Sequence, residues 1–216
     1  MNSFIIGDIH GEITQLKELL NKINYDGSQN LYFLGDYIDR GEDSFKTYMF
    51  IKKLKKENPN IVLIRGNHEQ MLIDAVLNKE IDHNLYSKEN AMIIWQQNGG
   101  AKTFRDFKED MGKLIKAAEW FDTLPYIHET EDYILVHAGV DPNKRLYEQD
   151  KSDFIWIRNK FIFAEKLKVN KIVVAGHTPF DKPRVLGNKV LLDTGAGKSG
   201  YLTAMDIKNG QFISLN

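Results

Sequence analysis

Residues 31–41 read Leu-Tyr-Phe-Leu-Gly-Asp-Tyr-Ile-Asp-Arg-Gly, and this stretch decides the fold. Its first four residues are apolar, which predicts a short buried strand that ends at Gly35. Asp36, Asp39 and Arg40 follow, and three charges at the end of a buried strand cost free energy unless a partner compensates them. Ligands of open α/β sheets bind outside the carboxyl ends of the strands. The stretch therefore predicts either a solvated strand-to-helix loop or one edge of a ligand site.

The rest of the chain repeats this order of apolar run, polar loop and helix. Runs at residues 3–6, 31–34 and 61–64 precede polar loops, and apolar residues at helical spacing follow over 12–23 and 45–57. Alternation of this kind predicts right-handed crossovers and a parallel sheet. Two further runs, at 133–136 and 171–175, end in polar residues in the same way. Residues 190–193, 201–207 and 211–215 are closely spaced strands with glycine turns, and we expect antiparallel pairing among them.

Residues 69–122 contain no β-rich run, and their apolar residues recur at helical spacing. We interpret them as a helical insertion that packs beside the sheet and is a plausible place for substrate selection. After a variable polar stretch, we expect a helix that follows residues 154–158 and runs to about Lys166. Because no linker rich in Ser, Gly or Pro divides the chain, we expect residues 1–216 to form a single α/β domain.

Composition excludes several function classes. The chain has 216 residues, a net charge of −1 and no cysteine. A balanced charge gives no bulk attraction to nucleic acid or to an anionic membrane, so we expect neither as a partner. Without cysteine there is no disulfide and no thiolate metal site. We find no secretory signal or transmembrane span, and expect a cytoplasmic protein that is monomeric by default.

The polar residues at the strand ends form a pattern. Five apolar runs end in carboxylate, imidazole or amide side chains, most of them directly beside a glycine that permits close backbone approach to a ligand. Such side chains, in the absence of cysteine, suit divalent Mn, Fe or Zn. More candidate ligands than one ion needs indicate two ions. The residues are Asp8 and His10, Asp36 and Asp39, Asn67 and His68, His137, and His177.

Five ordered motifs resemble the phosphoprotein phosphatase branch of the calcineurin-like metallophosphoesterases. Within that branch, this chain is similar in length and in motif sequence to the small bacterial and phage serine/threonine phosphatases and to the symmetrical diadenosine tetraphosphate hydrolases. The resemblance spans residues 4 to about 203, and 156–158 and 192–195 look like later segments of that branch. The five motifs are Gly-Asp-Ile-His-Gly (7–11), Gly-Asp-Tyr-Ile-Asp-Arg-Gly (35–41), Arg-Gly-Asn-His-Glu (65–69), His-Ala-Gly (137–139) and Gly-His-Thr (176–178).

This resemblance implies a four-layer α/β/β/α sandwich with two divalent ions, manganese first, with Fe, Zn, Ni or Co as alternatives. Hydroxide held between the ions would attack phosphorus in line. His68, paired with Asp39, would act as the general acid on the leaving oxygen. The implied metal ligands are Asp8 and His10 for the first ion, Asp36 as the bridge, and Asn67, His137 and His177 for the second. The implied phosphate contacts are Arg40, Arg65 and Arg158.

Several residues carry alternatives. Arg65 could instead be structural and pair with a carboxylate such as Glu69, and the motif of Arg158 is weaker than the others. Asp193 ends a strand outside the ligand pattern, which favours a turn or a supporting role. His83 and His128 match no motif, and we expect surface or core positions for both.

The run Gly-Ala-Gly-Lys-Ser-Gly over 195–200 lacks the glycine-to-lysine spacing of a nucleotide-binding loop, so the sequence does not favour that function.

The function we expect is therefore a metal-dependent phosphomonoesterase acting on phosphoserine or phosphothreonine in proteins. The alternative is a symmetrical diadenosine tetraphosphate hydrolase, which uses the same metal chemistry with a different pocket wall. A non-enzymatic metal-binding scaffold is disfavoured, because every implied ligand and the pair formed by His68 and Asp39 are present.

Overall fold

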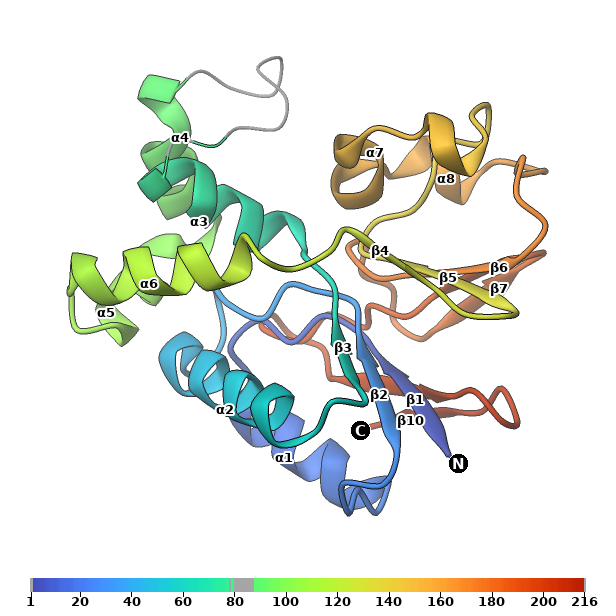
Figure 1. Ribbon diagram of the computed structural model, residues 1–216, viewed down its shortest axis with the longest axis horizontal. Helices are drawn as coiled ribbons and strands as arrows, with labels where there is room; N and C mark the ends of the chain where they lie inside the picture. The colour runs from blue at the N-terminus through green and yellow to red at the C-terminus, as the bar shows by residue number, and fades with distance from the viewer. Residues whose placement is uncertain (1, 78, 80–87, 216) are drawn as a thin grey trace.

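Two five-stranded sheets face each other, and helices cover the outer side of each (Figure 1). The computed structural model describes residues 2–77, 79 and 88–215. These layers form the α/β/β/α sandwich that the resemblance implies. His83 lies outside the described residues.

The first sheet has the order β10-β9-β1-β2-β3. β1 pairs with β2 and β2 with β3 in parallel, which confirms the parallel arrangement predicted for the first three runs. β9 joins β1 and β10 in antiparallel fashion, so the expected pairing of the last two runs is also confirmed. The strands are β1 (Ser3–Ile6), β2 (Asn30–Phe33), β3 (Ile61–Leu63), β9 (Thr203–Asp206) and β10 (Phe212–Ser214).

The second sheet has the order β4-β5-β6-β8-β7, with β5, β6 and β8 parallel and an antiparallel strand at each edge. The antiparallel pairing expected between residues 190–193 and the strands after them is wrong. β8 pairs in parallel with β6 and forms its hairpin with β7, whose three exposed residues are too short a run to be recognised as a strand. The strands are β4 (Ile127–Glu129), β5 (Tyr133–Val136), β6 (Ile172–Ala175), β7 (Arg184–Leu186) and β8 (Lys189–Leu191).

The helices lie on the two outer faces, and the insertion lies beside the first sheet (Figure 1). α1 (Ile13–Lys22) and α2 (Ser44–Glu57) match the two expected helices within two residues. The described residues of the insertion are mostly helical, as expected, with a kink at Gln96–Gly100, where Gly99 has a non-helical φ of +113°. Its helices are α3 (Asn67–Leu77), α4 (Lys88–Trp95), α5 (Ala101–Asp106) and α6 (Met111–Phe121).

On the second sheet the helical segment is divided. α7 (Lys151–Trp156) begins earlier than expected, and α8 (Asn159–Ile162) ends before residue 166. The chain is extended at Ile157, which separates the two helices. A short 3₁₀ turn (Leu146–Glu148) precedes them.

Three apolar layers hold the four structural layers together. The largest packs helices α1, α2, α3 and α6 on the first sheet, and another packs α7 and α8 on the second. Between the sheets lie Ile5, Leu34 and Ile64 from one side and Leu135 and Val174 from the other. Because this middle layer joins strands just before their carboxyl ends, it fixes the strand ends of both sheets relative to one another. Among the described helices, none has the length and apolarity to span a bilayer.

Candidate active site

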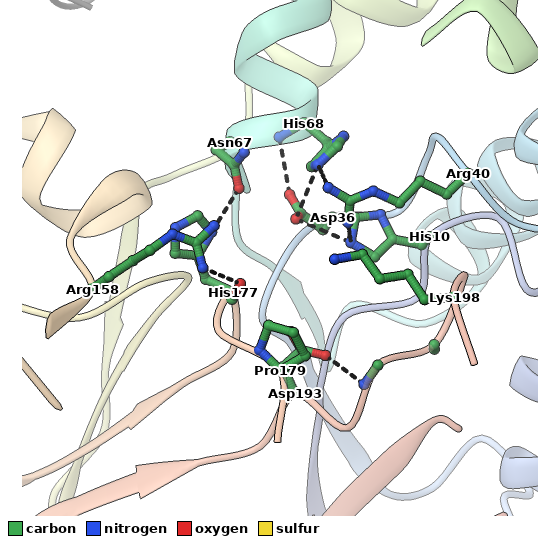
Figure 2. Close-up of a pocket in the computed structure, with 12 residues that line it drawn as sticks. His10, Asp36, Arg40, Asn67, His68, Arg158, His177, Pro179, Asp193 and Lys198 are labelled. Carbon is green, nitrogen blue, oxygen red and sulfur yellow. Dashed lines mark hydrogen bonds and ion pairs between the residues drawn. The ribbon is translucent and has the colours of Figure 1, made fainter. Parts of the chain in front are cut away.

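The polar residues singled out in the sequence meet where the carboxyl ends of the two sheets adjoin (Figure 2). The first sheet places its residues after β1, β2 and at the start of α3, and the second sheet places one histidine after β5 and one after β6. All of them are buried, so their charges interact through protein rather than through bulk water. The converging residues are Asp8, His10, Asp36, Asp39, Asn67, His68, His137 and His177.

The backbone at this site is strained. Five non-glycine residues have φ in the left-handed region, at +47°, +52°, +72°, +73° and +65°. Each such residue costs about 1–3 kcal/mol and persists only where the surrounding contacts impose it. Strain concentrated here is typical of functional loops, since the side chains must face the ligand rather than follow the relaxed chain. In the same order, the residues are His10, Asp36, Asp39, Arg40 and His177.

Glu69 holds the loops after β2 and β3 together. Its carboxylate accepts N–H bonds from Asp36 (2.9 Å), Tyr37 (2.8 Å) and Gly66 (3.0 Å). Burial, with the nearby charge of Asp36, raises the pKa of Glu69 to about 8. Gly66 has to be glycine, because a Cβ there would lie 2.2 Å from Asp36 Oδ1. The sequence motif contains Glu69, but its part in positioning Asp36 was not anticipated.

One group of candidate metal ligands is formed by Asp36, Asn67, His137 and His177. Asn67 Oδ1 lies 2.8 Å from His137 Nε2 and 2.9 Å from His177 Nδ1, and Asp36 Oδ2 lies 3.4 Å from His137 Nε2. His137 Nδ1 donates to the carbonyl of Leu34 (2.9 Å), so its Nε2 carries the lone pair when the ring is neutral. Burial lowers the pKa of His137, which favours that neutral form.

Asn67 Oδ1, His137 Nε2 and Asp36 Oδ2 are then three acceptors that face one another. A cation is what such a set can bind, so these residues fit a divalent metal.

A second group contains His10, Asp36 and His68, whose ligand atoms lie within 4.8 Å of one another. His10 Nδ1 donates to the carbonyl of Ile38 (3.1 Å), which leaves Nε2 as an acceptor 3.4 Å from Asp36 Oδ2. Asp36 thus belongs to both groups. Asp8, expected beside His10, lies outside this second group, and its carboxylate accepts the N–H of His177 (3.0 and 3.2 Å).

Asp8, Asp36 and Asp193 are buried at this site, and their charges interact. Burial, together with Asp193 and Asp36, raises the pKa of Asp8 well above its ordinary value. Burial alone would also raise the pKa of Asp36, but the surrounding imidazoles hold it far below its usual range. Burial raises the pKa of Asp193 to about 6, despite the N–H bond from Gly195. Such a concentration of anionic groups favours bound cations, in agreement with the ligand groups above.

His68 and Asp39 form a buried pair. His68 Nδ1 lies 2.7 Å from Asp39 Oδ2, and Asp39 Oδ1 accepts from the hydroxyl of Thr103 (2.5 Å). Thr103 belongs to α5, so the insertion orients this pair. His68 Nε2 faces the pocket, 3.9 Å from Asp36 Oδ2, and accepts from Arg40 Nη2 (2.7 Å). Arg40 Nη1 donates to His10 Nε2 (2.6 Å), so Arg40 lies between the two imidazoles (Figure 2).

The three arginines expected at the phosphate do not lie together. Arg40 and Arg158 line the pocket, and Arg158 donates to the carbonyl of His177 (3.0 Å). Arg65 is buried and is not part of the pocket wall. Its guanidinium donates to Gln70 Oε1 and Tyr126 Oη, and forms an ion pair with Asp122 (3.1 Å).

The expectation that Arg65 contacts phosphate is therefore corrected. The structural alternative holds for Arg65, with Asp122 rather than Glu69 as its partner. Asp122 follows the last helix of the insertion, and the sequence between residues 65 and 122 gives no signal that pairs them.

The pocket itself is a small polar cavity of about 50 Å³. Besides the expected residues, its wall includes Pro179, Asp193, Ala196 and Lys198. The glycine-rich run around Lys198 lacks the spacing of a nucleotide-binding loop, so its sequence did not predict a place in the pocket, and for Asp193 a turn or supporting role was expected. His128 lies away from the site, with its ring 5.5 Å from that of Tyr32, in agreement with the expectation for it.

Comparisons with known proteins define the class. The chain belongs to the calcineurin-like phosphoesterases, since the model of that family matches residues 1–203, and it is accordingly a hydrolase of the metallophosphoesterase type. Members of this class use a dinuclear metal centre, and Asp36 is shared between two groups of candidate ligands here.

Individual relatives carry two kinds of name. Serine/threonine-protein phosphatase 2 of Escherichia coli is 27% identical over 95% of this chain and 92% of its own length. The asymmetrical bis(5'-nucleosyl)-tetraphosphatase PrpE of Oceanobacillus iheyensis is 27% identical over 98% of this chain and 90% of its own. A solved cold-active protein tyrosine phosphatase matches the fold with a TM-score of 0.67 and 19% identity, over 100% of this chain and 78% of its own.

Proposed function

We propose that this chain hydrolyses phosphoric esters with two divalent cations, manganese first among them. Asp8, His10 and Asp36 would hold one cation, and Asp36, Asn67, His137 and His177 the other. When bound, such ions lower the pKa of water and offset the charge of a phosphate. Fe, Zn, Ni and Co remain alternatives to manganese.

The observation that carries this proposal is the pair formed by His68 and Asp39 beside Asp36. Asp39 orients the ring through Nδ1, so Nε2 is the atom that faces a substrate, and a proton held on Nε2 can pass to a leaving oxygen. A scaffold that only bound metal would have no use for this buried pair.

Arg40 and Arg158 supply the remaining chemistry of the chain itself. Both line the cavity, Arg40 from the loop after β2 and Arg158 from the link between α7 and α8, so together they orient a phosphate from two sides. Arginine keeps its charge and donates in a planar fork that matches phosphate oxygens. Arg40 donates to His10 and His68 here, and a bound phosphate would compete for the same donors.

Two substrate classes fit this chemistry. Phosphoserine and phosphothreonine in proteins are the first candidate, supported by the name of the E. coli relative. Dinucleoside polyphosphates are the second, supported by the name of the O. iheyensis relative and by the lysine and the adjoining hollow described below.

The test compares hydrolysis of p-nitrophenyl phosphate, a phosphothreonine peptide and diadenosine tetraphosphate at equal enzyme. We expect chelation to abolish all activity and manganese to restore it. Turnover that persists in excess chelator, with the metal content shown to be zero by elemental analysis, would contradict the metal-dependent mechanism. The ratio of kcat/KM between the last two substrates ranks the two classes.

A further inference from the structure

The glycine-rich run at residues 195–200 forms a closed loop between β8 and β9. Lys198 N (3.1 Å) and Gly200 N (3.0 Å) both donate to the carbonyl of Gly195, and Gly195 N donates to Asp193 Oδ1 (2.8 Å). Thr194 Oγ1 donates to the carbonyl of Tyr201 (2.5 Å) and so ties the two ends together. No helix follows this loop, so it is not a nucleotide-binding loop of the strand-to-helix type, but it has a fixed shape.

This loop packs directly on a candidate metal ligand. Gly197 has a φ of +74°, and a Cβ there would lie 2.4 Å from His10 Cβ. Ala196 is buried in the apolar layer beneath. With its middle residues held in this way, the loop presents the side chain of the next residue, Lys198, to the pocket.

Lys198 adds a third cation to the pocket, beside Arg40 and Arg158. Figure 2 shows its side chain extending over the cavity on the side of His10, whereas Arg158 approaches from the side of His177. Two arginines already suffice to orient one phosphate from two sides. A third positive group on a separate, anchored loop suits a second anionic group close to the first.

Beyond Lys198 lies a second, larger hollow of about 380 Å³. It shares Pro179, Gly195 and Lys198 with the pocket, so the two adjoin at this lysine. Phe180 and Tyr201 also line it, and the Tyr201 hydroxyl is held by the carbonyl of Asp181 (2.7 Å). The volume falls within the range of about 300–1,000 Å³ that small-molecule sites occupy. Aromatic rings at its wall suit a flat heterocycle.

We propose that Lys198 binds the phosphoryl group next to the reacting one in a phosphoanhydride chain, and that the hollow receives the attached nucleoside. This deepens the second candidate substrate class, and it rests on the proposed phosphohydrolase activity. In the reaction, water adds across one P–O–P bridge, the bridging oxygen leaves with one fragment, and two phosphate ends result. Lys198 takes no part in the bond changes and only holds the neighbouring phosphoryl group.

Phosphoanhydrides fit these observations better than phosphopeptides do. Lys198 lines the same small cavity as the groups around the reacting phosphate, so its partner has to lie about one phosphoryl group away. In a polyphosphate chain the next phosphate is joined through a single oxygen. An acidic side chain in a peptide would have to fold back over the backbone to reach the same place.

The test uses the full chain loaded with manganese and three variants: Lys198→Ala, Lys198→Arg and the control Lys208→Ala. Lys208 is an exposed lysine in the turn between β9 and β10. We expect Lys198→Ala to raise KM for diadenosine tetraphosphate about tenfold, which is the loss of one charge-assisted contact, with kcat changed less. The loss of kcat/KM on p-nitrophenyl phosphate should be several times smaller. Lys198→Arg should recover most of the affinity, and Lys208→Ala should match the unaltered chain.

Binding gives a second measurement that does not depend on turnover. In calorimetry, Lys198→Ala should weaken the binding of inorganic pyrophosphate more than the binding of orthophosphate. To test the hollow, Phe180→Ala should raise KM for diadenosine tetraphosphate but leave that for inorganic tripolyphosphate unchanged.

Three outcomes would overturn the inference while leaving the proposed activity intact. One is that Lys198→Ala loses kcat/KM equally on diadenosine tetraphosphate, p-nitrophenyl phosphate and a phosphothreonine peptide. Another is that it loses no kcat/KM on diadenosine tetraphosphate. The third is a loss confined to phosphothreonine peptides with acidic neighbours, which would assign Lys198 to peptide recognition. By contrast, an unaltered chain that cleaves none of these substrates with any of the candidate metals would contradict the proposed function itself.

Discussion

The two sheets contribute unequally to the site. The first supplies Asp8, His10, Asp36 and Asn67 together with the pair formed by His68 and Asp39, whereas the second supplies two imidazoles, His137 and His177. Asp8, Asp36 and Asp39 thus come from one sheet, whereas the other contributes the two imidazoles and the carboxylate of Asp193, which follows β8. Most of the negative charge at the site therefore lies on the first sheet, and the proposed metal centre needs side chains from both sheets.

This difference separates two roles in the site. Asp36 is held by Glu69 and contacts imidazoles from both sheets, at 3.4 Å from His10 and from His137. The second sheet is tied to it by Asn67, whose amide oxygen meets His137 and His177. Substitutions in the shared residue should therefore affect both metals, and substitutions on one side only should leave part of the site intact.

The largest effect should come from Asp36→Asn. Removing the shared negative charge leaves two cations without a common ligand, so we expect both to bind weakly and turnover to fall on the order of 10³-fold or more. Asn67→Ala removes a ligand from one group only and should cost less. Elemental analysis measures the metal content of the two variants, and p-nitrophenyl phosphate hydrolysis measures their turnover. Asp36→Asn protein that keeps two metals and near-normal turnover would refute the shared role.

The next effect concerns the first sheet alone. His68→Asn should retain both metals and lose about 10²–10⁴-fold in turnover on a phosphoserine peptide, because an alkoxide needs a proton to leave. The loss on p-nitrophenyl phosphate should be much smaller, since p-nitrophenolate leaves without one. Asp39→Asn should show the same substrate dependence more weakly. The loss of turnover in the double variant should be smaller than the combined losses of the two single variants. Equal losses on both substrates, with both metals present and chemistry rate-limiting, would exclude the general-acid role.

Two arginines offer a sharper test of the pocket wall. Arg158→Ala should raise KM about tenfold with little change in stability, because Arg158 faces the cavity. Arg65→Ala should instead lower the free energy of unfolding by about 3 kcal/mol, because it removes a buried guanidinium that bonds Asp122, Gln70 and Tyr126. Urea unfolding and KM, measured on both variants, distinguish the two. A large rise in KM for folded Arg65→Ala would return Arg65 to the phosphate site.

The smallest effect on activity should come from Lys189 in the second sheet. Its buried ammonium donates to the carbonyls of Phe161 (3.1 Å), Ile162 (2.8 Å) and Ala164 (2.6 Å) at the end of α8. Lys189→Met keeps the aliphatic stem but leaves these three carbonyls without the ammonium donor, which should lower the free energy of unfolding by about 2–3 kcal/mol. Turnover per folded molecule should stay unchanged. The exposed Lys168→Met serves as the control, and equal unfolding curves for the two variants would show that the contacts of Lys189 contribute nothing.

The sequence predicted the first sheet well because its signals are local. Its parallel strands β1, β2 and β3 are short apolar runs, each followed within three residues by a glycine, and a helix with a clear apolar stripe follows, as in α1 with Leu16, Leu19 and Leu20. Parallel crossovers then bring Asp8, Asp36 and Asn67 to one edge. These positions follow from the chain order alone.

The sequence predicted less of the second sheet because its signals depend on tertiary contacts. β7 is exposed and β4 is three residues long, so neither shows a buried pattern, and without β7 the pairing of β8 was assigned to the wrong partner. The same limit applies to the site. Arg65 pairs with a residue 57 positions away, and Lys198 reaches the pocket only because its loop folds onto His10.

The site lowers the stability of the whole protein, because five of its residues have left-handed backbone conformations: His10, Asp36, Asp39, Arg40 and His177. Glycine adopts these angles without the penalty that a side chain brings. Substitution by glycine at these five positions would therefore raise the melting temperature, but each such substitution would also remove a side chain that the proposed chemistry uses. Engineers who seek a hardier enzyme should look elsewhere in the chain, since durability and turnover conflict directly at this rim.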